Sequence, residues 1–247
     1  MDVPRATPPL PVDASPSTVA AAARIVALVP AHDEGPRIGA VIREAARHLP
    51  VIVVDDGSSD DTEARARAAG AARVIVQRPN RGKGAALRTG FAAALADGVD
   101  AVIALDADGQ HDPGEIPRFL EAFAAGRPDL VVGRRDFRRM PPVRRLSNEL
   151  GGRVFSWSVG RRIPDNQSGY RLVSARLMTA LAGSGEDGFA FEVEMITTCV
   201  REGWPIAWVP IRTIYAGEPS HIRPVAHLRE FVGICRRARR EVRGRRR

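Results

Sequence analysis

Two carboxylates and an amide follow an apolar run near the middle of this chain, and they could bind a divalent cation. The run is residues 101–105 (Ala-Val-Ile-Ala-Leu), and Asp106, Asp108 and Gln110 come directly after it. Such a run is typical of a buried strand, and in open α/β sheets ligands bind beyond the carboxyl ends of the strands. The two carboxylates suit Mg²⁺ or Mn²⁺, which proteins often bind together with substrate phosphates. A solvated turn is the alternative, since Asp and Gly are ordinary turn residues.

A second pair of acids, Asp55 and Asp56, follows the apolar run 51–54. Acids behind a buried strand must be solvated, paired or used. Asp60 or a neighbouring serine could also cap the helix that comes next. The turn at residues 30–34 (Pro-Ala-His-Asp-Glu) carries a carboxylate that could accept hydrogen bonds from a base or a ribose, or could cap its own helix.

Residues 80–85 (Asn-Arg-Gly-Lys-Gly-Ala) place a cation between two glycines at the expected start of a helix. Glycine lets a ligand approach the backbone, and helix N-termini favour phosphate. Lys83 is the only lysine among 37 lysines and arginines, which hints that its compact ammonium matters. The spacing is not that of a Walker A motif, and no Gly-x-Gly-x-x-Gly follows the first strand, so a dinucleotide cofactor is not expected. Residues 165–171 form a further polar cluster, whose acid could be a general base, could hold an acceptor or could build a turn.

The elements that would position these residues alternate in type. Strands are expected at residues 24–29, 51–54, 73–77, 101–105 and 130–132, and the first should stop at Pro30. Helices are expected from Pro36 to about Leu49, from Ser58–Asp60 to Gly70, from Gly82 to Ala96 and from Asp112 to Gly126. This alternation predicts a mostly parallel sheet. The acids behind the first, second and fourth strands should therefore share one edge of that sheet.

The second half of the chain is less regular. Helices are expected at 146–159 and 191–201, an extended segment at 206–214, and a loop at 165–171 that leads into a short strand. Residues 1–22 are rich in Pro, Ala and Ser, and we interpret them as a disordered leader. The folded domain would then be 23–221, followed by a basic amphipathic helix and an arginine-rich tail at 222–247.

The chain is basic, but its excess charge lies at one end. The formal net charge is +8, and residues 236–247 contain eight arginines and one glutamate, so the remainder carries only 8 − 7 = +1. A body this close to neutral argues against a non-catalytic nucleic-acid-binding protein that would use the arginine tail. No apolar run approaches the roughly 18 residues that span a membrane. Cys199 and Cys235 lack metal-type spacing and the N-terminus lacks a secretory signal, so we expect a cytoplasmic protein.

Taken in this order, the motifs resemble family 2 glycosyltransferases with the GT-A fold, and among them the polyprenyl-phosphate (dolichyl-phosphate-type) sugar synthases. The resemblance covers residues 24–221. It implies an α/β fold with a Rossmann-like, mostly parallel sheet flanked by helices, in one domain whose second half lies on the acceptor side. It also implies an inverting, metal-dependent enzyme that moves a sugar from a UDP- or GDP-linked donor to a polyprenyl phosphate, with Mg²⁺ or Mn²⁺ as cofactor.

The resemblance also implies roles for individual residues. With Lys83, the nucleotide-sugar site would contain Pro30, Ala31, Glu34, Val54, Asp56, Asp106 and Ala107. The metal would be held by Asp106, Asp108 and Gln110. The acceptor phosphate would be bound by Arg135, Arg144 or Arg145, Ser147, Arg171 and His221. The catalytic residues would be Asp108, through the metal, and Asp165.

In the main interpretation, a cation at Asp106 and Asp108 would neutralise the charge that develops on a diphosphate leaving group. A phosphate acceptor would then need positioning by arginines rather than a base.

Three alternatives to this interpretation stay open. A hydroxyl acceptor on a glycan or a lipid would need a base, for which Asp165 is the candidate. A sugar-phosphate nucleotidyltransferase would need a Gly-rich loop with Arg after the first strand, where this chain has Ala-His-Asp-Glu-Gly at 31–35. The last alternative is the nucleic-acid-binding protein.

The C-terminal helix has two interpretations. From Pro224 the apolar residues Val225, Leu228, Phe231, Val232 and Cys235 fall on one side of a helix that ends in the arginine cluster. Such a helix could lie on an anionic bilayer and give the protein a peripheral contact with the inner face of the membrane. It could equally pack against the core and leave a solvated tail.

Overall fold

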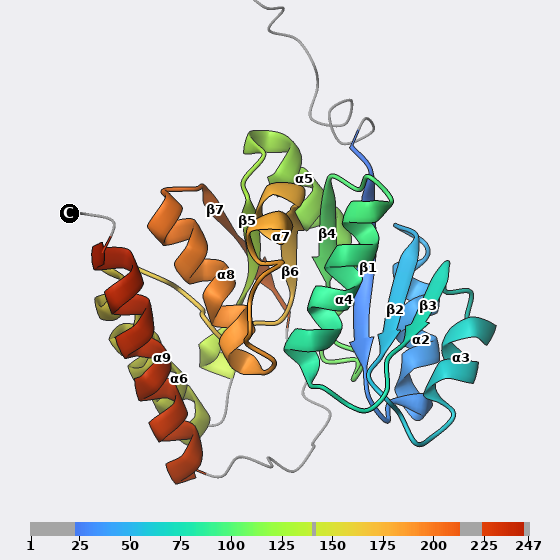
Figure 1. The fold of residues 1–247 in the computed structure, drawn as a ribbon, viewed down its shortest axis with the longest axis horizontal. Coiled ribbons are helices and arrows are strands. Elements are labelled where there is room, and N and C mark those ends of the chain that lie inside the picture. The colour runs from blue at the N-terminus through green and yellow to red at the C-terminus, as the bar shows by residue number, and fades with distance from the viewer. Residues whose placement is uncertain (1–22, 140–141, 213–223, 245–247) are drawn as a thin grey trace, which may run out of the picture.

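The structure, a computed structural model, describes residues 23–139, 142–212 and 224–244 (Figure 1). The predicted leader at 1–22 lies outside these residues, as do His221 and the end of the arginine tail. The side chains of residues 139, 142–144, 189 and 224–230 are likewise not described. No helix within the described ranges combines the length and the apolar character that crossing a membrane requires.

In the described parts of the chain, seven strands form one sheet in the order β3-β2-β1-β4-β6-β5-β7. Strand β6 runs antiparallel to both of its neighbours, β4 and β5, and all other pairs are parallel. The strands are β1 Ile25–Ala31, β2 Val51–Asp55, β3 Arg73–Val76, β4 Ala101–Ala104, β5 Leu130–Arg135, β6 Arg171–Ser174 and β7 Ile206–Ile211. The predicted α/β class with a mostly parallel sheet is confirmed. Because β6 is reversed, the loop that enters it lies at the same edge as the loops that leave β4 and β5.

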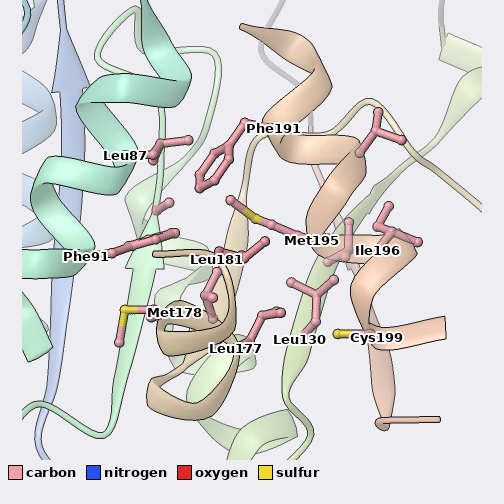
Figure 2. Packing of buried hydrophobic residues seen from close by; sticks show 14 of the residues in the cluster. Leu87, Phe91, Leu130, Leu177, Met178, Leu181, Phe191, Met195, Ile196 and Cys199 are labelled. Atoms are coloured by element: carbon pink, nitrogen blue, oxygen red, sulfur yellow. The ribbon is translucent and has the colours of Figure 1, made fainter. Parts of the chain in front are cut away.

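Helices cover both faces of the sheet and form two separate cores (Figure 1). Alternate residues of a strand point to opposite faces, so Leu28 packs in one core and Val29 in the other. The helices α2 and α5 cover one face, and α4, α7 and α8 cover the other, where Phe91 and Phe191 meet at a centroid distance of 6.0 Å (Figure 2). The helices are α2 Gly35–Ala45, α3 Thr62–Ala68, α4 Lys83–Ala96, α5 Ile116–Gly126, α6 Pro142–Val159, α7 Ala175–Ala180, α8 Phe189–Glu202 and α9 Pro224–Gly244, with short 3-10 turns at Pro113–Glu115 and Phe137–Arg139.

Two details of the predicted elements are wrong, and both have a local cause. Strand β1 continues through Pro30 to Ala31. Proline is tolerated there because its missing N–H would point toward β4, whose pairing with β1 ends at Leu28. The hydrophobic pattern also gives no sign of α7, a short helix that starts where Ser174 accepts a hydrogen bond from the Leu177 amide at 3.1 Å.

The helices α6 and α9 lie side by side at the opposite end of the molecule from β3 (Figure 1). The apolar side of α9 packs into the core that also contains α8, and Ile234, Cys235, Ala238 and Val242 are all buried there. Val232, predicted to lie on this side, is instead 37% exposed. Within the described residues, the core-packing interpretation of this helix therefore holds.

Candidate active site

The loops that follow β1 and β2 cap one another at the carboxyl edge of the sheet. Asp33 accepts a hydrogen bond from the Ser59 amide at 2.7 Å, and Ser58 Oγ accepts one from the Asp33 amide at 2.9 Å. Asp60 in turn accepts from the Gly35 amide, at the start of α2, at 3.0 Å. Hydrogen bonds from Ser59 lower the pKa of Asp33. Asp60 also accepts from the Thr62 amide at 2.9 Å, at the start of its own helix α3, so it caps both helices, and the bonds between the two loops fix the spacing of the strand ends.

Asp56 fixes the loop that leads into α4. It accepts from the Arg81 amide at 2.8 Å and, through its other oxygen, from the Gly82 amide at 2.7 Å. The Gln77 side-chain amide donates to it as well. Asp55 accepts from the Ser58 amide at 2.9 Å, while its Oδ2 is buried without a hydrogen-bond partner among the described residues. Asp56 was assigned to the nucleotide, but both of its oxygens are used in holding the loop that carries Lys83.

The glycines beside Lys83 serve packing. The Gly82 amide is taken by Asp56, and the Gly84 amide donates to the Asp187 carbonyl oxygen at 2.7 Å. A Cβ at Gly82 or Gly84 would lie 2.7 Å from backbone atoms of Asp187. These amides are therefore already used, and the expected phosphate cradle at this helix start is replaced by a close contact with the loop before α8.

Lys83, Asp106 and Glu192 form an ionic cluster at the end of β4. The Lys83 ammonium is paired with Asp106 and lies 3.1 Å from Glu192 Oε1. Burial alone would raise the pKa of Asp106, but Lys83, His111 and Arg171 together outweigh it and lower that pKa to about 2. Burial alone would lower the pKa of Lys83, and the two carboxylates raise it instead. A Cβ at Gly169 would meet Lys83 Nζ at 2.8 Å, Glu192 Oε1 at 2.9 Å and Asp106 Oδ2 at 3.0 Å, so any larger residue here would displace the charged ends of this cluster.

Asp108 and Gln110 lie in the tight turn after Asp106. Asp108 Oδ1 accepts from the Gln110 amide at 2.8 Å. Burial raises the pKa of Asp108, and the nearby Asp106 carboxylate raises it further. A divalent cation would relieve this repulsion. Among the described residues, no group of three or more His, Cys, Asp or Glu side chains is placed to hold a metal ion, so the protein would supply two carboxylates and the Gln110 amide oxygen. This set of hard oxygen donors fits Mg²⁺ or Mn²⁺ with substrate oxygens completing the shell.

A stack of aromatic rings supports Asp106 from behind. His111 Nδ1 accepts from the Asp106 amide at 3.0 Å, so this nitrogen carries no proton in the neutral ring. The His111 ring stacks on Tyr170 at 5.1 Å, and Tyr170 stacks on Phe119 at 4.4 Å. Burial lowers the pKa of His111. The stack therefore joins the backbone of the turn at residues 106–110, the candidate metal turn, to the loop that contains Gly169.

On the other side of β6, Arg135 and Asp165 form a bidentate ion pair. Arg135 Nε donates to Asp165 Oδ2 at 2.8 Å, and Nη2 donates to Oδ1 at 2.9 Å. The Gln167 amide also donates to Oδ1, at 3.0 Å. Asp165 is 1% exposed, so its carboxylate is enclosed and fully engaged. This arrangement orients the guanidinium of Arg135, and it leaves Asp165 poorly placed to remove a proton.

The comparisons with known proteins agree with this geometry. Residues 26–178, more than half of the chain, match the family described as Glycosyl transferase family 2. The chain belongs to glycosyltransferase family 2. It is 30% identical over 205 residues to the undecaprenyl-phosphate mannosyltransferase of Micrococcus luteus, covering 76% of this chain and 82% of that protein. It is 29% identical over 211 residues to the polyprenol monophosphomannose synthase of Mycolicibacterium smegmatis, covering 79% of each.

A solved structure extends the comparison to the whole fold. Glucosyl-3-phosphoglycerate synthase from Mycobacterium tuberculosis, in complex with Mn²⁺ and UDP-glucose, has a TM-score of 0.69 and 26% sequence identity, covering 93% of this chain and 81% of that chain. The GT-A fold expected from the sequence is therefore confirmed, and the enzyme is a glycosyltransferase.

Within this glycosyltransferase, the guanidinium of Arg171 is bonded to backbone. It is 1% exposed, and its guanidinium donates to the carbonyl oxygens of Ser168 at 2.7 Å, Asn166 at 3.3 Å and Glu192. These hydrogen bonds to backbone carbonyl groups do not favour the predicted contact of Arg171 with the acceptor, which stays a prediction. Arg171 instead ties the 165–170 loop to the start of α8.

The other residues predicted for the site include both buried and exposed side chains. Ala31, Val54 and Ala107 are buried in the sheet core, so their side chains support the edge rather than line it, while Pro30 is part of β1. Glu34 lies at the start of α2 and pairs with Arg37 at 3.0 Å. Arg145 and Ser147 are exposed on α6, where Arg145 pairs with Glu149 at 2.8 Å. The Arg144 side chain and all of His221 lie outside the described residues.

Sequence reasoning missed Glu192 and His111. Glu192 stands in the first turn of α8, far along the chain from the strand ends, and no apolar strand precedes it. His111 comes directly after Gln110 in the sequence, and this adjacency to a candidate metal ligand was the signal that could have identified it. The strongest signal for Glu192 was a carboxylate among otherwise apolar residues at 189–193, which are Phe-Ala-Phe-Glu-Val.

Proposed function

We propose that this glycosyltransferase moves a sugar from a nucleoside diphosphate sugar to the phosphate of a polyprenyl phosphate. The relative from Micrococcus luteus is named for transfer of mannose to undecaprenyl phosphate, and the one from Mycolicibacterium smegmatis for synthesis of polyprenol monophosphomannose. The structural neighbour is in complex with UDP-glucose. The observation that carries the choice of acceptor is the ion pair between Arg135 and Asp165. An Asp165 carboxylate that is engaged in this way favours a positioning role for it over that of a base, and the pair holds the Arg135 guanidinium in place.

The reaction needs no base when the acceptor is a phosphate. An acceptor phosphate oxygen forms a bond to the anomeric carbon, the bond from that carbon to the diphosphate oxygen breaks, and the nucleoside diphosphate leaves. Attack from the face opposite the leaving group inverts the anomeric configuration. Because the phosphate is already anionic near neutral pH, the protein has only to place it and to balance charge.

On the donor side, Asp106, Asp108 and Gln110 would hold Mg²⁺ or Mn²⁺, which when bound would neutralise the charge on the leaving diphosphate. Lys83 keeps a second cation at the same place, and its partly exposed side chain could bring that charge to a diphosphate oxygen. Glu192 and His111 keep Lys83 and the Asp106 backbone in position.

On the acceptor side, Asp165 presents the guanidinium of Arg135 in a fixed plane. A planar guanidinium suits phosphate recognition better than a flexible ammonium does. Arg135 is separated from the metal turn by strand β6, whose Arg171 is in register with Ala104 of β4 and with Val132 of β5. The two sites therefore lie side by side at one edge of the sheet.

The test compares three acceptors with UDP-glucose and GDP-mannose as donors: a short polyprenyl phosphate, the matching polyprenol, and 3-phosphoglycerate. We expect transfer to the polyprenyl phosphate and at least a hundredfold less to the alcohol. Equal use of the alcohol would overturn the phosphate mechanism. Preference for 3-phosphoglycerate would replace the lipid acceptor with a soluble one.

A substitution at Asp165 separates positioning from base catalysis. With polyprenyl phosphate, we expect Asp165→Asn to raise the KM for the acceptor about tenfold, which is the loss of about 1.4 kcal/mol of binding, while kcat changes little. A general base would instead show a collapse of kcat with an unchanged KM.

Calorimetric titration of UDP and GDP, with Mn²⁺ and then with EDTA, tests the donor side. We expect metal-dependent binding of one nucleotide that Asp108→Ala removes. Glu121→Ala, a change of a surface acid on α5, is the matched control. Metal-independent binding of equal strength would exclude the role of the acidic turn.

A further inference from the structure

One side of α6 exposes four large apolar side chains. Leu146 is 69% exposed, Leu150 59%, Val154 38% and Trp157 67%. Their spacings of four, four and three residues place them on one side of a helix with about 3.6 residues per turn. We refer to these four residues as the α6 stripe. Among the described residues, the other exposed large apolar side chain is Val232, on the neighbouring α9.

The stripe is additional to the side of α6 that packs in the core. Phe155 and Val159 are 0% and 1% exposed and belong to the core cluster shared with α8 and α9. A helix at the surface of a soluble domain normally carries polar residues opposite its buried side. Here that opposite side is apolar as well, and a contiguous exposed apolar surface marks a contact with a partner or a membrane.

The surroundings of the stripe are strongly basic. Residues 142–162 and 224–244 contain eleven arginines and three glutamates. Arg153 is exposed on the same side of α6 as the stripe, and the guanidinium of Arg239 lies 3.7 Å from the centre of the Trp157 ring. Arginines beside exposed Leu and Trp match an anionic lipid surface, where the apolar groups enter the interface and the guanidinium groups reach phosphates.

We propose that the α6 stripe binds the surface of an anionic bilayer and holds the enzyme there without a transmembrane segment of its own in the described chain. The apolar side of α9 cannot do this, because Ile234, Cys235, Ala238 and Val242 are buried. The choice of occupant rests in part on the proposed function, since a polyprenyl acceptor is embedded in a bilayer.

The position of α6 links this surface to the acceptor. The helix follows β5, which ends at Arg135, and a Cβ at Gly151 would lie 3.9 Å from Gln167 Nε2 in the loop that carries Asp165. Contact through the stripe would bring the acceptor edge of the sheet close to lipid phosphates.

The test is flotation of the full-length protein, without donor or acceptor, on two kinds of vesicle. One is phosphatidylcholine alone, and the other contains about 40 mol% phosphatidylglycerol, which gives an anionic surface. We expect binding to the anionic vesicles that weakens as salt is raised, and a loss of about tenfold or more in partitioning for Leu150→Gln combined with Trp157→Gln. Equal partitioning of this variant and the wild type would overturn the proposal.

Tryptophan fluorescence gives an independent readout. On anionic vesicles we expect a blue shift that brominated lipids quench and that disappears in Trp157→Phe. Trp204 and Trp208 are half-buried, so Trp204→Phe with Trp208→Phe is the matched control that should retain the shift. A shift that survives in Trp157→Phe would place the contact elsewhere.

Two further outcomes also decide against the bilayer. If the wild type ignores vesicles but forms a dimer that Leu150→Gln with Trp157→Gln dissociates in sedimentation experiments, the stripe is covered by a second copy. If it remains monomeric and unbound, the stripe has no lipid role. UDP binding by the same variant should equal that of the wild type, so failure of this inference can be distinguished from failure of the proposed function.

Discussion

Two surfaces of the molecule differ in how their side chains are held. One is the carboxyl edge of β1, β2 and β4, and the other is the outer side of the α6–α9 pair. At the edge, the acids are held by amides of neighbouring loops, as when Asp33 binds Ser59 and Asp56 binds Gly82. On α6, Leu150 and Trp157 are exposed and contribute no core packing. The first region is rigid before any ligand arrives, which suits a small, charged donor. The second leaves large apolar side chains outside the core, which suits contact with an extended surface.

The largest expected effect tests whether the buried guanidinium of Arg171 stabilises the fold. Arg171→Met should lower the free energy of unfolding by about 3–5 kcal/mol, because it leaves buried carbonyl groups without a donor. Urea unfolding measures this. Arg47→Met, which breaks an exposed pair with Glu44, should change it by less than about 0.5 kcal/mol. A loss of acceptor binding without a loss of stability would return Arg171 to the acceptor site.

The next effect concerns the close approach at Gly169. Gly169→Ala would force apart Lys83, Asp106 and Glu192, and we expect kcat/KM to fall about a hundredfold, since small misplacements in a site have effects of that order. Gly185→Ala is the control, because nothing lies within 4 Å of its Cβ position. Similar activity of both variants would mean that the ionic cluster adapts and is less rigid than we infer.

A smaller effect depends on pH. His111 is buried and its folded-state pKa lies below its ordinary value of 6.5, so the unfolded chain takes up the proton first. Stability should therefore fall as pH drops below about 6.5, by up to about 1.4 kcal/mol per pH unit from this group. His111→Asn keeps an acceptor for the Asp106 amide and should flatten the dependence, as urea unfolding at pH 7.5 and 5.5 would show.

The matched control is the exposed His48, and His48→Asn should keep the wild-type pH dependence. A pH dependence that is the same in all three proteins would mean that His111 takes up its proton in the folded state as readily as in the unfolded chain.

The smallest effect concerns the outer side of α6. Leu150→Gln with Trp157→Gln should change the free energy of unfolding by less than about 1 kcal/mol, because exposed side chains contribute little and the contact with Arg239 is at the surface. Phe155→Ala, on the buried side of the same helix, should cost about 3–5 kcal/mol. A large loss in the first variant would show that the stripe stabilises the fold itself.

The sequence predicts well what depends on continuous apolar runs. The strands around Val51–Asp55 and Ala101–Ala104 and the shared acidic edge follow from local pattern and from the geometry of parallel strands. It does not predict where a long side chain ends. Arg171 matches a motif, yet its guanidinium turns inward to carbonyl groups supplied by α8. Glu192 was missed for the same reason, since only tertiary packing brings the start of α8 to Lys83.

The reversed strand β6 also separates what can vary in evolution from what cannot. β5 and β6 are adjacent antiparallel strands, so residues 136–164, which precede the loop with Asp165 and Gly169, are in effect an excursion from a hairpin. Both ends of this excursion are fixed in the middle of the sheet, whatever lies between them. A lineage could replace α6 by another helix, a longer loop or a whole added module, and so change its acceptor or its anchorage, while the strand order and the metal turn stay as they are.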